Sequence, residues 1–274
     1  MIKRMLVNGE NSDQIAVMDR GLQYGDGVFE TMRIQAGHIP LWPYHWRRLQ
    51  KACDRLSIPL ADQQRLQAEI TAFISAEKVA VLKLILTRGK GERGYAMSEV
   101  VHPSCILMLS DSPDYPAEFW QSGVRVFSCQ TRLGINPTLA GIKHLNRLEQ
   151  VLARNEWQDT AYQEGLVKDI DNYVIEGTMS NFFWVKNNQL YTPALSRSGV
   201  EGVLREIVIE LAKAVSIPIN IGLWLEREMQ DADEIFMTNS LIGIWPVSYI
   251  FNKTFRAGPV TQQLQSLLQA KYGF

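Results

Sequence analysis

Lys143 is the side chain in this sequence with the clearest potential for covalent chemistry. A lysine amine can attack a carbonyl and form a Schiff base, provided that its surroundings shift its pKa from the usual value of about 10.4. Lys143 follows the apolar stretch 139–142 and precedes an amphipathic pattern, so we expect it to be partly buried at a strand-to-helix junction. The plain alternative is a lysine that flanks a helix and extends into solvent.

Glu176 is a second marker, at the end of a β-rich run and directly before Gly177. A carboxylate in this position can accept a hydrogen bond from a protonated ring nitrogen, and the ring then withdraws electrons from a bound substrate. Ser180 and Asn181 are expected to support the turn that follows. The alternative is a solvated glutamate in an ordinary turn.

Three further segments offer cations, backbone amides or hydroxyl groups to an anion. One is a helical segment with adjacent arginines, the second begins a helix after a glycine, and the third follows a β-rich run. Each signal is weak alone, because helix starts and surface arginines are common. The candidate anion-binding residues are Arg48, Val203, Leu204, Asn239 and Ser240.

Taken together, these segments resemble the fold-type IV enzymes, which use pyridoxal 5'-phosphate (PLP). Residues 19–31 carry a pattern shared across that family, and His45 to Leu49 match its His-x-x-Arg-Leu helix. The resemblance implies that Lys143 holds PLP as a Schiff base and that Glu176 faces the pyridine nitrogen. It also implies that the five anion-binding candidates hold the phosphate, with Arg48 preferred to Arg47, and that the protein is a homodimer.

Two segments favour one branch of the family. Residues 139–152 and 88–95 resemble the aminodeoxychorismate lyases, whereas 176–181 and 258–264 resemble the D-amino-acid aminotransferases. Leu148 stands where branched-chain aminotransferases carry a tyrosine, which argues against that branch. The expected reaction is therefore the conversion of 4-amino-4-deoxychorismate to 4-aminobenzoate and pyruvate, with Lys143 as general base.

Two alternatives stay open: a D-amino-acid aminotransferase, and a non-enzymatic binding protein that kept the scaffold. For the lyase substrate, which has two carboxylates, the sequence suggests three binding residues. Arg93 and Tyr95 lie in a glycine-rich loop, and Arg33 lies on an early β-rich run.

The 274 residues suit two α/β domains of the D-amino-acid aminotransferase type. We expect a small N-terminal domain at 1–113, a linker at 114–123 that follows a Pro/Asp/Ser cluster, and a larger domain at 124–274 that carries the PLP lysine. Apolar periodicity predicts helices at 43–56, 63–76, 144–157, 201–215 and 258–272.

The composition excludes several classes of protein. A net charge of -1 gives no general attraction to nucleic acid or to an anionic membrane. The three cysteines and four histidines show no metal-ligand spacing, so we expect no metal site. The apolar run after the basic N-terminus is too short for a signal peptide, and Lys83 interrupts the most apolar stretch, which predicts a cytoplasmic protein.

Overall fold

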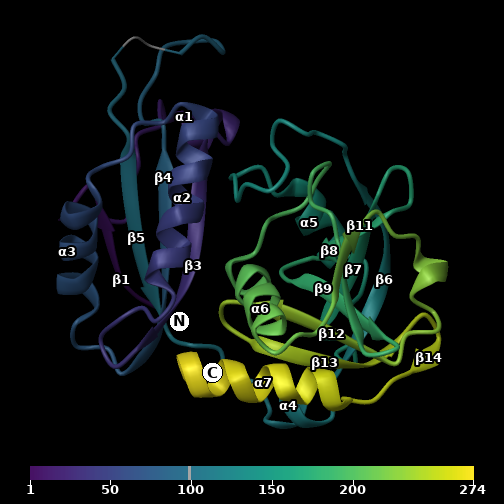
Figure 1. The fold of residues 1–274 in the computed structure, drawn as a ribbon. Helices are drawn as coiled ribbons and strands as arrows, with labels where there is room; N and C mark the ends of the chain where they lie inside the picture. Colours follow the sequence, from purple (N-terminus) through teal and green to yellow (C-terminus); the bar gives the residue numbers. More distant parts are fainter. Residues whose placement is uncertain (98–99) are drawn as a thin grey trace. The chain divides into compact units, whose positions relative to one another are not determined.

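The computed structural model describes residues 1–97 and 100–274, which form two compact units. Unit 1 comprises Met1–Pro113 and Ile142–Asn146, and unit 2 comprises Asp114–Gly141 and Arg147–Phe274. Most of unit 1 is purple and blue in Figure 1, and most of unit 2 runs from teal to yellow.

Unit 1 is built on an antiparallel sheet with the strand order β2-β1-β5-β4-β3. Asn8 and Gly9 adopt positive φ angles of 53° and 83° and close the first hairpin. The elements of unit 1 are β1 (Ile2–Val7), β2 (Glu10–Asn11), α1 (Arg20–Tyr24), β3 (Gly27–Gln35), α2 (Trp42–Leu56), α3 (Gln63–Ile74), β4 (Val79–Thr87) and β5 (Ser104–Ser110).

Helix α2 covers β3 with residues at helical spacing, and its bounds confirm the helix predicted at 43–56. Its buried residues are Trp42, His45, Leu49, Ala52 and Cys53. Helix α3 confirms the second predicted helix, with an end two residues earlier than expected. The side chain of Asp62 caps its start by accepting hydrogen bonds from the amides of Gln64 and Arg65.

Unit 2 is built on a mixed sheet with the order β11-β10-β9-β12-β13-β6-β7-β8, and β14 pairs with β13. The pairs β10–β11, β6–β13 and β6–β7 are parallel. Its strands are β6 (Val124–Leu133), β7 (Glu164–Asp169), β8 (Val174–Gly177), β9 (Asn181–Lys186), β10 (Gln189–Pro193), β11 (Ile219–Gly222), β12 (Glu234–Asn239), β13 (Gly243–Ile250) and β14 (Lys253–Thr254). Its helices are α4 (Glu118–Gln121), α5 (Leu148–Arg154), α6 (Val203–Ala214) and α7 (Pro259–Tyr272), with a 3-10 turn at Glu226–Glu228.

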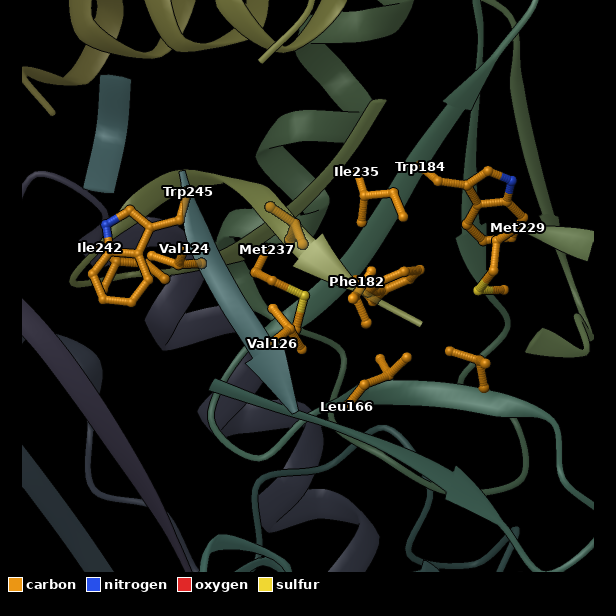
Figure 2. Packing of buried hydrophobic residues seen from close by; sticks show 13 residues of the cluster. Val124, Val126, Leu166, Phe182, Trp184, Met229, Ile235, Met237, Ile242 and Trp245 are labelled. Atoms are coloured by element: carbon orange, nitrogen blue, oxygen red, sulfur yellow. The ribbon is translucent and has the colours of Figure 1, made fainter. Parts of the chain in front are cut away.

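The core of unit 2 is a cluster of buried aromatic and aliphatic side chains from its central strands. Figure 2 shows Phe182 and Trp184 of β9 beside Ile235 and Met237 of β12, with Val126 of β6 nearby. All of these side chains are at most 2% exposed. The cluster holds rigid the strands whose ends carry the candidate site residues of this unit.

The expected linker at 114–123 is wrong, because this segment is part of unit 2. It contains α4, and the indole nitrogen of Trp120 donates a 2.6 Å hydrogen bond to the carbonyl of Ile242. The Trp120 ring also meets the ring of Trp245 edge-on, with the centroids 5.9 Å apart.

The helix predicted at 144–157 is shorter than expected and begins at Leu148. Residues 143–145 instead pair with β3, through hydrogen bonds from the Phe29 amide to the Lys143 carbonyl and from the Leu145 amide to the Gly27 carbonyl, each 2.9 Å long. This pairing places Ile142–Asn146 in unit 1, whereas we expected the lysine in the larger domain.

The apolar residues of α5 differ in exposure. Ala153 is buried, but Leu148 and Leu152 are 77% and 60% exposed.

In the part of the chain that the structure describes, no helix has the length and apolar character required to cross a membrane.

Candidate active site

Lys143 lies on a short strand-like segment at the β3 edge of the unit 1 sheet. Gly141, two residues earlier, has a φ of +84° and exchanges 3.0 Å hydrogen bonds with the segment 199–201 of unit 2. The backbone is therefore fixed on both sides of the lysine. The half-buried side chain places Nζ 4.3 Å from the centroid of the Phe29 ring.

Arg48 of α2 forms a buried network with Glu30 of β3 and His45 of α2. Arg48 Nε and Nη2 donate to the two oxygens of Glu30 at 2.8 and 2.5 Å, and His45 Nδ1 lies 2.6 Å from Glu30 Oε2. Burial acts to raise the pKa of Glu30, but the charge and hydrogen bonds of Arg48 and the hydrogen bond of His45 outweigh it and lower the pKa to about 2.

His45 completes this network as a neutral donor. Burial lowers its pKa, so that the ring is neutral at pH 7 and Nδ1 carries the proton that binds the Glu30 carboxylate. The forked contact with Glu30 fixes the guanidinium plane of Arg48. That Arg48 binds a phosphate stays a prediction.

Glu176 lies on β8 and is 5% exposed. Its Oε2 atom accepts a 2.9 Å hydrogen bond from the Val200 amide and a 3.4 Å hydrogen bond from the Asn181 amide group, which also donates to the Val200 carbonyl at 2.9 Å. Two glycines allow the 199–202 loop to come this close. A Cβ on Gly202 would lie 1.9 Å from Asn181 Oδ1, and one on Gly199 would lie 3.2 Å from the Glu176 carboxyl carbon.

The turn after Glu176 is organised by Glu164 of β7, which the sequence analysis missed. Glu164 is 1% exposed and accepts hydrogen bonds from the Thr178 and Ser180 hydroxyls (2.5 and 2.7 Å) and from the amides of Gly165, Thr178 and Met179. All five donors are neutral. Burial therefore prevails over the hydrogen bonds, and the pKa of Glu164 is raised.

Val203 and Leu204 are the first two residues of α6, which begins two residues later than the helix predicted at 201–215. Gly202 precedes them and has no side chain with which to cap their amides. The amides at a helix start carry partial positive charge and can bind an anion. The buried Arg205 points away from this end, because its Nη2 atom donates to the Pro193 carbonyl at 2.9 Å.

Asn239 and Ser240 lie at the end of β12, in the turn that leads to β13. The Asn239 carboxamide is used within the protein: Oδ1 accepts from the amides of Leu241 and Ile242, and Nδ2 donates to the Met179 carbonyl at 3.1 Å. Asn239 therefore connects this turn to the turn after Glu176. Ser240 follows it directly.

The glycine-rich loop that carries Arg93 and Tyr95 is exposed, and Tyr95 is 84% exposed. The buried Arg20 of α1 donates to the carbonyls of Gly94, Tyr95 and Ala96, at 3.0 to 3.3 Å, and pairs with Asp26 through Nε at 2.9 Å. The side chain of Arg20 thus holds the loop in shape by binding the backbone carbonyls of residues 94–96. Residues 98–99 lie outside the described part of the chain.

The candidate residues thus fall into two sets. Unit 1 contains Arg33, Arg48, Arg93, Tyr95 and Lys143, whereas unit 2 contains Glu176, Val203, Leu204, Asn239 and Ser240. Within unit 2, the loop that fixes Glu176 leads directly into α6, and Asn239 binds the turn that follows Glu176. In residues 1–97 and 100–274, no group of three or more His, Cys, Asp or Glu side chains is arranged to hold a metal ion.

The chain belongs to the class IV aminotransferase family, whose sequence model matches residues 27–250. This confirms the predicted family and fold. The chain is 37% identical over 266 residues to an aminodeoxychorismate lyase of Vibrio harveyi, which covers 96% of this chain and 98% of the relative. The crystal structure of a 4-amino-4-deoxychorismate lyase from Pseudomonas aeruginosa is similar with a TM-score of 0.95 and 45% identity, over 98% of this chain and 100% of that one.

Aminotransferases of the same family are also similar to this chain, at lower identity. A D-alanine aminotransferase of Bacillus licheniformis is 27% identical over 277 residues, with 97% of this chain and 96% of the relative covered. The full-length match to both activities agrees with a scaffold that is shared across the family, on which local residues select the reaction.

Proposed function

We propose that this protein is a PLP-dependent lyase that converts 4-amino-4-deoxychorismate to 4-aminobenzoate and pyruvate. The observation that carries the proposal is the 45% identity, over the full chain, to a lyase of this name whose fold is superimposable. The residues around Lys143 and the loop 88–95, which resemble the lyases, support the same choice.

The residues present fit the cofactor. Glu176 is a buried carboxylate held in place by donors that touch Oε2, as expected for a partner of the pyridine nitrogen. The helix start at Val203 and Leu204 lacks a capping side chain, and the nearby Ser198 hydroxyl is buried without a hydrogen-bond partner in the described residues. Such groups suit a dianionic phosphate. Lys143 would hold the cofactor covalently, and Arg48 and Ser240 would bind the phosphate.

When bound, the cofactor supplies an electron sink for the carbanion that forms at the amine-bearing carbon of the substrate. Lys143 then has two tasks. It exchanges with the substrate amine, and its free amine removes the proton from the carbon that bears this amine. The electron pair forms the ring double bond as the carbon–oxygen bond to the enolpyruvyl group breaks. The departing enolate takes up a proton to become pyruvate, and the carbocycle becomes aromatic.

The other residues position these groups. Glu176 would accept a hydrogen bond from the ring nitrogen, and the side chain of Asn181 and the amide of Val200 hold its carboxylate in place. Arg93, Tyr95 and Arg33 are proposed to bind the substrate carboxylates. Arg20, which holds the backbone of the 94–96 loop, would set the shape of that contact.

We further propose a homodimer in the cytoplasm. The support is the exposed apolar face of α5, where Leu148, Val151 and Leu152 are each more than half exposed. Contiguous exposed leucine and valine side chains on one helix are unfavourable in water and are typical of an interface.

A D-amino-acid aminotransferase is the second candidate, because residues 176–181 and 258–264 resemble that branch and a D-alanine aminotransferase is among the relatives. Incubation of the purified, PLP-loaded protein with 4-amino-4-deoxychorismate alone separates the two activities. A lyase forms 4-aminobenzoate over many turnovers, whereas an aminotransferase needs a keto acid. Pyruvate is a poor readout, because transamination of alanine also produces it.

Replacement of Lys143 tests the role of the lysine. We expect Lys143→Ala to lower the rate of turnover at least about 10³-fold, because covalent attachment and general-base catalysis are both lost. The exposed Lys78→Ala is the matched control, which should keep wild-type activity. Full turnover by the Lys143→Ala variant would refute the assignment.

A further inference from the structure

The two faces of the unit 1 sheet differ in burial. Along β3, one face is almost fully buried and consists of Val28, Glu30, Met32 and Ile34. The other face, with Phe29, Thr31 and Arg33, is half-buried. Residues directly opposite on antiparallel strands share a face. Lys83, opposite Thr31 on β4, and Lys143, opposite Phe29, therefore lie on the half-buried face.

Two lysines on this face contact the same aromatic ring. Lys143 Nζ lies 4.3 Å and Lys83 Nζ lies 5.2 Å from the centroid of Phe29. Because both distances are measured to one point, the two nitrogens are less than about 10 Å apart. Arg33 adds a third cation to the same face, and its partial burial lowers the pKa of the guanidinium.

Lys83 differs in its ion pairing from three other basic residues of unit 1. Lys3 forms ion pairs with Glu77 and Asp111, and Arg20 and Arg88 share Asp26. Lys83 lies on a central strand and is partly removed from water, yet in residues 1–97 and 100–274 its ammonium group contacts the Phe29 ring and forms no ion pair. A half-buried cation of this kind is best stabilised by an anionic ligand.

We propose that Lys83, together with Arg33, binds the ring carboxylate of the substrate and so helps to determine specificity for 4-aminobenzoate-type molecules. This inference rests on the proposed lyase function, and it names a binding residue for that reaction. Lys83 touches the substrate but takes no part in the bond changes.

The dimensions of the substrate agree with this assignment. In 4-aminobenzoate the amine and the carboxylate are on opposite sides of a six-membered ring, so nitrogen and carboxyl carbon are about 6 Å apart from ordinary bond lengths. A hydrogen bond from the carboxylate to an ammonium group adds about 2.8 Å. The total is comparable to the largest separation that the ring contacts allow between the two lysine nitrogens.

The test uses Lys83→Met in the PLP-loaded enzyme, with the exposed Lys78→Met as a control that removes the same charge just before the same strand. Binding of 4-aminobenzoate and of aniline, which lacks the carboxylate, is measured by calorimetric titration. We expect Lys83→Met to weaken 4-aminobenzoate binding about tenfold or more and aniline binding less than twofold, because only one ligand loses a charged contact. The KM for 4-amino-4-deoxychorismate should rise by a similar factor, with kcat within about threefold of wild type.

The proposal is overturned if the ratio of the two binding constants is unchanged in Lys83→Met, whether both ligands weaken equally or neither does. An equal loss with the Lys78→Met control also overturns it, since a general charge effect would then suffice. Failure of the lyase function is a separate result, because it is judged by whether the wild-type enzyme forms 4-aminobenzoate from 4-amino-4-deoxychorismate alone.

Discussion

Two buried glutamates, one in each unit, have almost the same exposed fraction, but their pKa values are shifted in opposite directions. Glu30 and Glu164 are 2% and 1% exposed. Glu30 faces the guanidinium of Arg48, which lowers its pKa to about 2 against the effect of burial. In residues 1–97 and 100–274 the hydrogen-bond donors to Glu164 are hydroxyls and backbone amides of Gly165 and residues 178–180, so burial prevails and its pKa is raised. Several neutral hydrogen bonds thus stabilise a buried charge less than one cation does.

Each carboxylate holds a neighbouring candidate residue or turn within its own unit. Glu30 orients Arg48, a proposed phosphate ligand, and Glu164 holds the turn that follows Glu176. The first task fixes a charged group, which needs an opposite charge. The second fixes backbone and hydroxyl groups, for which an acceptor is sufficient. The difference in pKa is therefore a consequence of what each glutamate holds.

Glu30→Gln should give the larger loss of stability. The substitution leaves Arg48 buried beside a neutral group, and breaking a buried ion pair in this way costs about 3–5 kcal/mol. We expect the free energy of unfolding in urea, followed by tryptophan fluorescence at pH 7, to fall by that amount. The exposed Glu92→Gln in the same unit is the control. A loss below about 1 kcal/mol would show that the charge on Glu30 is not required.

Glu164→Gln should give a smaller loss. An amide can accept from the Thr178 donors through its oxygen, but its NH₂ group would meet the Met179 amide and the Ser180 hydroxyl. The loss of one or two neutral hydrogen bonds should lower the free energy of unfolding by about 1–2 kcal/mol.

The functional effect of Glu164→Gln separates the two glutamates further. Because the turn after Glu176 relaxes, we expect PLP to dissociate several times faster during dialysis, as followed by its absorbance. The exposed Glu118→Gln of the same unit should leave the dissociation rate unchanged. If Glu164→Gln costs as much stability as Glu30→Gln, the distinction between charged and neutral partners is lost.

The sequence was informative where a pattern is local. The apolar spacing of α2 depends on residues a few positions apart, and the structure has this helix where it was predicted. Helix α6 is also present, although it begins two residues later than predicted. The segment after Lys143 was misassigned for the opposite reason. Its apolar period is helical, but the amide of Leu145 is bonded to Gly27, more than a hundred residues away in the sequence.

In the candidate site, too, the sequence identified residues within local motifs but not those whose role depends on contacts distant in the sequence. Lys143, Glu176 and Arg48 could be named because the motifs contain them. Glu164 could not, because its five donors come from β7 and from a turn more than ten residues later, and no spacing rule connects them. Lys83 was noticed only as an interruption of an apolar run. Its meaning depends on the register of β3 and β4, which places it opposite Thr31.

The smallest expected effect is on the pH dependence of stability. A group whose pKa is raised on folding contributes stability that is fully present below its unfolded pKa, here 4.5, and that is lost as the pH rises through the folded value. Glu164 should therefore make the wild type lose stability, relative to Glu164→Gln, as the pH increases from 4.5 toward 7. Urea unfolding of both proteins at several pH values measures the difference, and all other titrating groups cancel. Glu30 acts in the opposite direction: its lowered pKa contributes stability above 4.5 that is lost as the pH falls toward 2. A wild-type advantage over Glu164→Gln that stays constant or grows between pH 4.5 and 7 would mean that Glu164 is ionised as easily as Glu30, and that its neutral donors are sufficient after all.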